Sequence, residues 1–149
     1  MFNVKIAEGS SKKASPYIRE CLKKAAREGR IDAALCAGSR VDLLIMPRGA
    51  GDGGEKAGCM LLAGGQTPAG EVKSVRCGLS RGDELTLSSI GRENALLTLR
   101  KDITTLSGEL LEPQEISVEL TRPAEPEAVL AAAGAMLLLG ADPGGLKLS

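Results

Sequence analysis

The chain has 149 residues, of which 43% are hydrophobic and 26% charged, so it is long and apolar enough for one domain with its own core, and intrinsic disorder is excluded. Its formal net charge is zero and aromatic residues make up 1%, so we expect neither a nucleic-acid nor a membrane partner. The sequence contains no histidine, which excludes histidine-dependent triads, Cys–His pairs and histidine-ligated metals.

The charges are unevenly distributed along the chain. Residues 1–30 contain eight Lys or Arg and three Asp or Glu, whereas residues 102–149 contain eight Asp or Glu and two Lys or Arg. One interpretation is a basic N-terminal face that meets an acidic C-terminal face, within one chain or between two. The other is a pair of ordinary solvated surfaces.

The four cysteines, Cys21, Cys36, Cys59 and Cys77, are widely spaced and form no C-x-x-C pair, so a zinc ribbon or a thioredoxin-type site is not expected. The first residues lack the apolar segment of a signal peptide, and we therefore expect a cytoplasmic protein with reduced thiols. The longest apolar run, Ala128 to Leu139, is too short to span a bilayer.

The first 14 residues are predicted to contain a short strand, Phe2 to Ala7, and a flexible connector. A helix is then predicted from Ser15, as the N-cap residue, with Pro16 at the first helical position. Apolar residues at i, i+4 spacing give this helix one apolar stripe up to about Glu28, and Gly29 is expected to stop it.

The middle of the chain is predicted to form a series of strands. Two mostly apolar runs indicate buried strands, a third run indicates a further strand, and two alternating runs around the turn at 91–94 indicate a β-hairpin. A later run, Ile116 to Leu120, alternates with Glu and Ser as in a half-exposed strand. The buried runs are Val41–Met46 and Gly58–Ala63, the third strand is Val72–Cys77, and the hairpin runs are Leu85–Ser88 and Ala95–Leu99.

A final helix is predicted from about Pro126 and Glu127 to Leu139, and it has no polar face, so it should be buried. Gly140 and Pro143 are expected to end it. The whole pattern predicts a single α/β domain over residues 1–149. It should contain a mixed sheet of about six to eight strands including the β-hairpin, flanked by the amphipathic N-terminal helix and the buried C-terminal Ala/Leu-rich helix.

The segment 49–54 fits the pattern G-x-G-x-x-G directly after a predicted strand. Too few residues follow before Gly58 to supply the helix of a dinucleotide site, so a plain connecting loop is one interpretation. The other is a backbone nest that binds an anion, with Arg48 as the charged contact. The candidate ligand-binding residues are Arg48, Gly49, Gly51, Asp52 and Gly54, together with Gly64 and Gly65 after the next strand.

No catalytic residue, cofactor or metal ligand is predicted. The P-loop pattern and the G-x-S-x-G pattern are both absent from the sequence. Glu115 and Glu119 share one face of a predicted strand and are expected to be solvated, while Cys59 and Cys77 lie in predicted strands and are expected to be buried, inert thiols.

Three segments resemble part of the central domain of the Mur ligases, the ATP-dependent enzymes that add amino acids to UDP-N-acetylmuramate. They are GCMLLAGG at 58–65, VKSVRCGLSRGDELTLSSI at 72–90 and EAVLAAAGAMLLLGADPGGL at 127–146, within an overlap of residues 16–148. The P-loop, the metal-binding Glu and His, the carbamylated Lys, the Asn-Asp-Asp turn and the C-terminal domain of that family have no counterpart here. The resemblance therefore implies a trimmed relative without ligase chemistry.

These observations favour a non-catalytic α/β binding or interaction domain, linked through the resemblance to cell-wall metabolism. Its expected partners are a second copy, another protein or a small molecule. The first alternative is an enzyme or sensor that binds a nucleotide or sugar-nucleotide through the Gly-rich loop 48–54. The second is a structural homodimer formed through an exposed hairpin edge.

Overall fold

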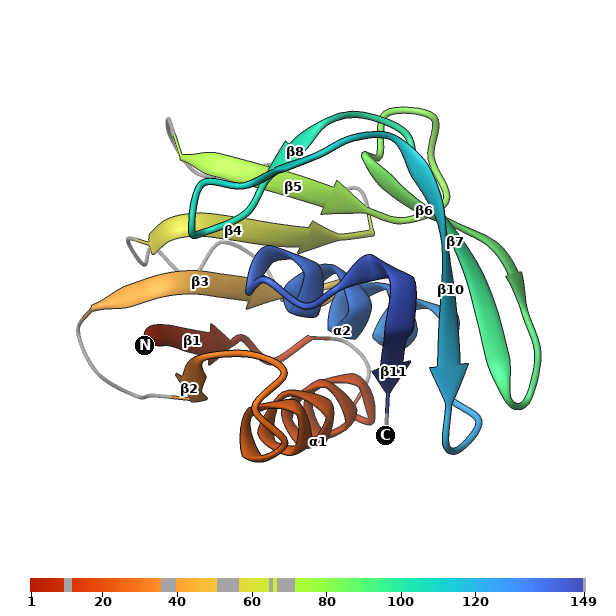
Figure 1. The fold of residues 1–149 in the computed structure, drawn as a ribbon, viewed down its shortest axis with the longest axis horizontal. Coiled ribbons are helices and arrows are strands. Elements are labelled where there is room, and N and C mark those ends of the chain that lie inside the picture. Colours follow the sequence, from red (N-terminus) through yellow and green to blue (C-terminus); the bar gives the residue numbers. More distant parts are fainter. Residues whose placement is uncertain (10–11, 36–39, 51–56, 65, 67–71, 149) are drawn as a thin grey trace.

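The computed structural model describes residues 1–9, 12–35, 40–50, 57–64, 66 and 72–148. Within these residues it shows an α/β fold with two α-helices and a mixed sheet, as predicted (Figure 1). The sheet has nine strands, slightly more than the six to eight expected. The surplus comes from very short strands, which carry too few residues to show an alternating pattern.

The sheet combines a parallel half with a mostly antiparallel half. The strands are β1 (Phe2–Ile6), β2 (Ala33–Leu35), β3 (Val41–Met46), β4 (Ala57–Ala63), β5 (Lys73–Cys77), β6 (Leu85–Ile90), β7 (Asn94–Leu99), β10 (Gln114–Leu120) and β11 (Leu146–Leu148). Their spatial order is β11-β10-β7-β6-β5-β4-β3-β1-β2. Strands β2, β1, β3, β4 and β5 run parallel, and β6, β7 and β10 form antiparallel neighbours, with β11 parallel to β10. A separate pair is formed by β8 (Ile103–Thr104) and β9 (Leu110–Leu111).

The two halves of the sheet meet at a single residue pair. Cys77 of β5 pairs with Leu85 of β6, and beyond that point the two strands separate. Strands β6, β7 and β10 consequently cross the direction of β3, β4 and β5, so that the sheet bends around its contents (Figure 1). The hairpin β6–β7 is antiparallel as predicted, and it lies between β5 and β10 in the strand order.

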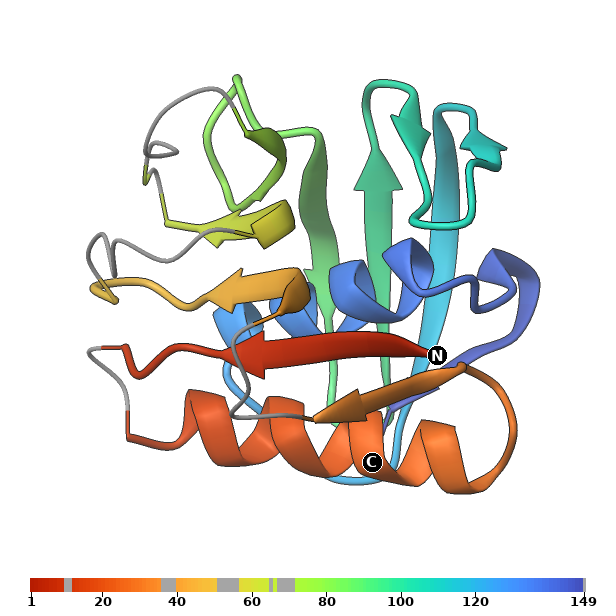
Figure 2. The same ribbon diagram turned by 90° about the vertical axis from the view of Figure 1, so that its left-hand side faces the viewer.

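The helix α2 (Pro126–Leu138) lies in the concave side of this bend. Its residues from Ala128 to Leu138 are all buried, which confirms the prediction of a helix without a solvent face. It contacts both halves of the sheet and also the first helix (Figures 1 and 2). Gly134 allows the close approach, because a Cβ atom there would lie 3.2 Å from Cδ1 of Leu61 and 3.4 Å from Cδ2 of Leu85.

The helix α1 (Ala14–Arg27) covers β1 and β2 with the predicted apolar stripe. Its start differs from the prediction, because Lys13 is the N-cap residue and Ser15 lies inside the helix. The Ser15 side chain is fully buried, and its hydroxyl donates a hydrogen bond to the carbonyl of Ala7 at 3.1 Å. A tertiary contact with the end of β1 therefore replaces the expected local cap. The helix ends as predicted before Gly29, which has a φ of 73°.

The far face of β3 and β4 carries a second, smaller apolar cluster of Val41, Leu44, Met46, Met60 and Leu62. Each of these side chains is at most 7% exposed. Residues of the same strands that point the other way belong to the main core. Both faces of these strands are therefore buried, as their continuous apolar sequences indicate.

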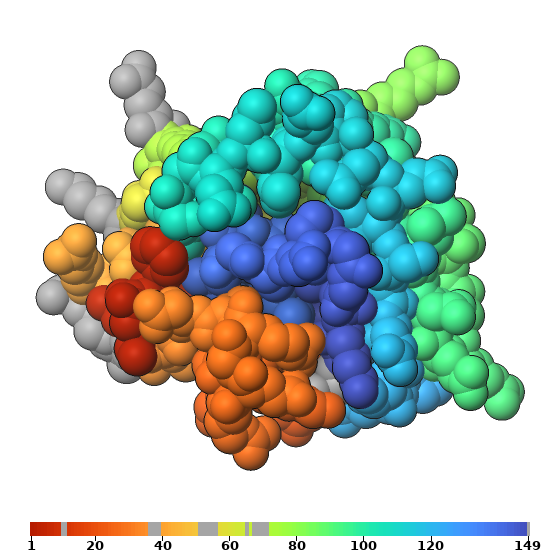
Figure 3. Space-filling view, in the orientation of Figure 1, coloured from red at the N-terminus to blue at the C-terminus, as the bar shows by residue number. Residues whose placement is uncertain are grey.

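The remaining segments close the fold near α2. Strand β10 buries Ile116, Val118 and Leu120 and exposes the residues between them, as predicted. A 3-10 turn, η1 (Pro143–Gly145), leads from α2 into β11. The segment after α2, in blue, lies at the surface between α1 in orange and the connection around residues 100–112 in teal (Figure 3). Among the described helices, none is long and apolar enough to cross a membrane.

Candidate functional site at the carboxyl edge of the sheet

Five parallel strands end at one edge of the sheet, and both α-helices begin beside it. The Ser15 hydroxyl ties the start of α1 to the end of β1, and Glu127 in the first turn of α2 reaches the residue that follows Pro47 at the end of β3. Open α/β sheets bind ligands outside the carboxyl ends of their strands, at the point where the strand order reverses. That point here lies between β1 and β3.

The backbone connections after β1 and β3 are packed tightly together at this point. A Cβ atom at Gly9 would lie 2.7 Å from the carbonyl oxygen of Arg48 and 2.9 Å from Cβ of Pro47. Glycine is therefore required at position 9 for the two chains to approach this closely. Any ligand at this edge must lie outside these connections.

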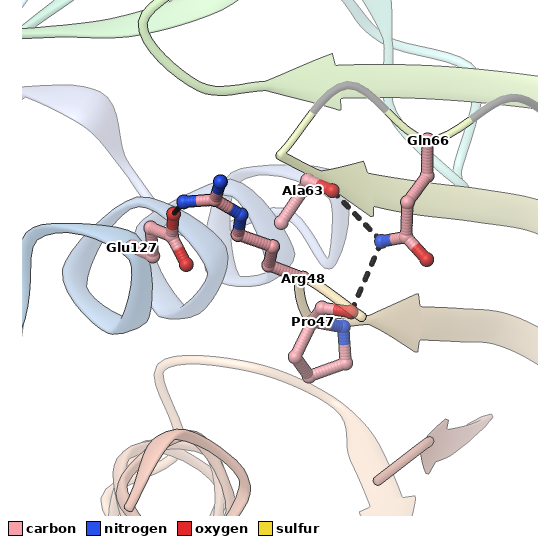
Figure 4. Close-up of polar contacts among 5 residues, drawn as sticks. All are labelled: Pro47, Arg48, Ala63, Gln66 and Glu127. Atoms are coloured by element: carbon pink, nitrogen blue, oxygen red, sulfur yellow. Dashed lines mark hydrogen bonds and ion pairs between the residues drawn. The ribbon is translucent and has the colours of Figure 1, made fainter. Parts of the chain in front are cut away.

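The structure brings together two of the predicted site residues, Arg48 and Gly64. The Arg48 side chain lies across Gly64, since a Cβ atom there would be 2.7 Å from Cγ of Arg48. Its guanidinium Nη1 atom lies 3.1 Å from Oε1 of Glu127 (Figure 4). The predicted anion contact is thus engaged by a carboxylate of the same chain.

The other predicted site residues divide into two groups. Gly49 follows Arg48 directly and has a φ of 80°, which suits glycine in a turn. Gly51, Asp52, Gly54 and Gly65 lie outside the described residues. The proposed nest in the loop 48–54 is therefore represented here by its first residues, Arg48 and Gly49.

Gln66 holds the ends of β3 and β4 together and was not predicted from the sequence. Its side-chain Nε2 atom donates toward three carbonyl oxygens, those of Met46, Pro47 and Ala63, at 2.9, 3.0 and 2.7 Å. Figure 4 shows the contacts to Pro47 and Ala63. Its Oε1 atom is buried and has no hydrogen-bond partner among the described residues. In the sequence, the signal that could have indicated this role is the polar Gln66 directly after the Gly64-Gly65 pair.

The connection after β5 is stabilised by a buried carboxylate. Asp83 is 3% exposed, and its Oδ2 atom accepts a hydrogen bond from the backbone N–H of Ser80 at 2.8 Å. A Cβ atom at Gly78 would lie 2.7 Å from the same oxygen. Asp83 therefore closes a turn rather than facing an open site.

A cavity of about 600 Å³ adjoins this edge. It lies between the first two turns of α1 and the segment that joins β10 to α2, and we call it the Tyr17 cavity. The Arg122 guanidinium lies 5.2 Å from the centre of the Tyr17 ring and forms an ion pair with Glu20. The lining residues that are charged or aromatic are Lys12, Lys13, Tyr17, Glu20, Arg122 and Glu125.

Tyr17 remains a neutral phenol at any ordinary pH. Burial is the main cause that raises its pKa, the neighbouring Cys21 adds to the effect, and the positive charge of Arg122 opposes it. The Tyr17 hydroxyl is buried, and Cys21 lies close enough to it to raise its pKa. Tyr17 is the one tyrosine in the sequence, and it belongs to the buried stripe of α1.

The described cysteines are buried free thiols. Burial raises the pKa of Cys59, and burial together with the nearby carboxylates of Asp83, Glu127 and Glu84 raises that of Cys77 to about 12. Since the thiolate is the reactive form, the burial of Cys59 and Cys77 favours the prediction of inert thiols. Within the described ranges, no group of three or more Cys, Asp or Glu could hold a metal ion.

Comparison with known proteins adds no relative to this description. No family model, curated protein or solved structure matches the chain. The resemblance to the Mur ligases therefore stays a prediction from the sequence, and the proposals below rest on the geometry of the carboxyl edge and the Tyr17 cavity.

Proposed function

We propose that the protein is a non-catalytic binding domain that takes a small ligand in the Tyr17 cavity. The supporting observation is the place of the cavity, beside the edge where the parallel strands end and the helices begin. Its volume of about 600 Å³ lies within the usual range of small-molecule sites. This proposal moves the predicted ligand site from the loop 48–54 to the adjoining cavity.

The lining selects a ligand with an apolar part and an anionic part. Pro16, Tyr17, Pro123, Ala124 and Ala128 offer an apolar surface beside the charged residues. The basic residues of the lining, Lys12, Lys13 and Arg122, outnumber its two acidic residues. A planar group could stack on the tyrosine ring where Arg122 now lies, while its anionic group contacts the basic residues.

Binding without turnover is favoured by the chemistry of the chain. The sequence has no histidine to serve as a general base, and the described cysteines are buried. The free thiols are also consistent with a reducing compartment, and we propose a cytoplasmic location. The resemblance to the Mur ligases makes cell-wall precursors the first ligands to test.

Thermal shift and isothermal titration with a panel of nucleotides, UDP-N-acetyl sugars and sugar phosphates would test this proposal. Arg122→Gln should abolish the response to any compound that binds, because it removes the charge above the Tyr17 ring. Arg92→Gln, in the exposed hairpin turn, is the matched control and should leave binding unchanged.

Other outcomes would contradict the proposal. Binding that is lost on Arg48→Ala but kept on Arg122→Gln would place the ligand at the Gly-rich loop, as in the nucleotide-binding alternative. Chemical conversion of a bound compound, followed by mass spectrometry, would show an enzyme. If no compound of the panel produces a response, the cavity does not bind the ligand class proposed for it.

A further inference from the structure

The outer strand of the parallel half, β2, has a neighbour on one side only among the described strands. It pairs with β1 through Phe2↔Ala33, Asn3↔Ala34 and Val4↔Leu35. Its three residues are half-buried and include no charge, no proline and no bulge. Charges, prolines, bulges and very short length are the devices that normally keep another strand from joining a sheet edge, and of these β2 has only its short length.

The backbone of β2 has hydrogen-bonding groups that face away from the sheet. The N–H of Phe2 donates to the carbonyl of Asp32 at 3.0 Å, so Asp32 points its carbonyl toward β1. Because the N–H and C=O groups of successive strand residues point to alternate sides, those of Ala33 and Leu35 point outward. An added strand could pair with these groups.

A groove of about 490 Å³ runs between this strand and α1. Its floor is apolar and is formed by Val4, Leu22 and Ala26 with the residues of β2, and two exposed basic residues of α1, Lys23 and Arg27, also line it. Leu35 pairs with the buried Val4 and therefore projects to the same face. Alternate residues of an added strand would project into this groove.

We propose that β2 is extended by a strand of a partner protein whose groove-facing side chains are acidic in the middle and apolar at the ends, because Lys23 and Arg27 lie one helical turn apart. The outward N–H and C=O groups of Ala33 and Leu35 supply the pairing. The apolar floor and the charges of Lys23 and Arg27 select the sequence, as in other cases of strand addition to a bare edge. This surface is separate from the Tyr17 cavity and does not depend on the function proposed for it.

The test is an NMR titration of the whole protein with a nine-residue blocked peptide. The peptide has threonine at the odd positions and valine, glutamate, glutamate and valine at the even ones. We expect it to shift the backbone amide signals of Ala33 and Leu35. A second peptide with lysine in place of glutamate should bind about tenfold more weakly, as two exposed ion pairs allow. The Lys23→Glu, Arg27→Glu double variant should reverse this preference.

Two further variants complete the test. Ala33→Pro removes an outward N–H that β1 does not use, and Leu35→Glu places a carboxylate in the groove, so each should abolish binding of the glutamate peptide. Arg122→Gln should leave this binding unchanged, which separates this surface from the Tyr17 cavity. The proposal is overturned if neither peptide binds, if both bind equally, or if both variants bind like the original chain. Self-association in sedimentation experiments that Ala33→Pro abolishes would identify a second copy as the occupant, against the proposal.

Discussion

Nη1 of Arg48 lies 3.1 Å from Oε1 of Glu127, which joins the connection after β3 to the first turn of α2 (Figure 4). The two side chains are 67% and 38% exposed, and exposed ion pairs contribute about 0–1 kcal/mol. We expect Arg48→Ala and Glu127→Ala each to lower the free energy of unfolding by less than about 1 kcal/mol. Urea unfolding of the two single variants and of the double variant would measure this loss of free energy. A loss above about 2 kcal/mol for Arg48→Ala alone would mean that its aliphatic part packs over Gly64 as a structural element.

Gly134 is a position at which α2 lies close to the sheet. A Cβ atom there would meet Cδ1 of Leu61 at 3.2 Å, so the branched side chain of Gly134→Val should overpack the core. We expect a loss of about 1–3 kcal/mol in the free energy of unfolding. Gly134→Ala is the control, since its gain in helix propensity, about 1 kcal/mol, opposes the tighter contact. Equal stabilities for the two variants would contradict this packing.

Gln66 should not tolerate conversion to an acid. Gln66→Glu would turn a carboxylate toward the three carbonyl oxygens that Nε2 now contacts, with an expected cost of about 1–3 kcal/mol at pH 7. The introduced carboxyl should have a raised pKa in the folded protein, so the loss should shrink as the pH falls below about 5. Gln66→Ala removes the same hydrogen bonds without a charge. Its unfolding free energy, measured over the same pH range, should not show this recovery.

The buried thiol of Cys77 makes stability depend on alkaline pH. Its pKa is raised from 9.0 to about 12 in the folded protein. Below about pH 9 the thiol is protonated in both states and the full stability is present. Between about pH 9 and 12 only the unfolded chain loses the proton, so the free energy of unfolding should fall by about 1.4 kcal/mol per pH unit from this group. Cys77→Ala should have a shallower slope in urea unfolding at pH 9–11, and an unchanged slope would contradict the assignment.

Most of the fold could be predicted because its main elements carry a clear period. Helix α2 has no polar face and is buried all round, and β10 alternates and is half-exposed. The short strands β2 and β11 have three residues each, too few for any pattern, and their pairing depends on partners distant in the sequence. Ser15 was misassigned because a local capping pattern competes with a tertiary hydrogen bond to Ala7, and the tertiary bond prevails.

The candidate site was less accessible to sequence reasoning. The position of Arg48 after a buried strand placed it correctly at the carboxyl edge, but its partner Glu127 is 79 residues away in the chain. The Tyr17 cavity combines the start of α1 with Arg122, which is 102 residues from Glu20. Contacts of this separation depend on the bend between β5 and β6, and no local motif encodes that bend.

The enclosure of α2 by both halves of the sheet has a consequence for biosynthesis. Residues 126–138 follow ten of the strands in the chain, so during translation those strands emerge before the helix that fills their concave side. Until then, large side chains such as Leu61 and Leu85 lack the helix that packs against them. The nascent chain should therefore be a substrate for chaperones, and completion of the core should be a late and slow step because its contacts are distant in sequence.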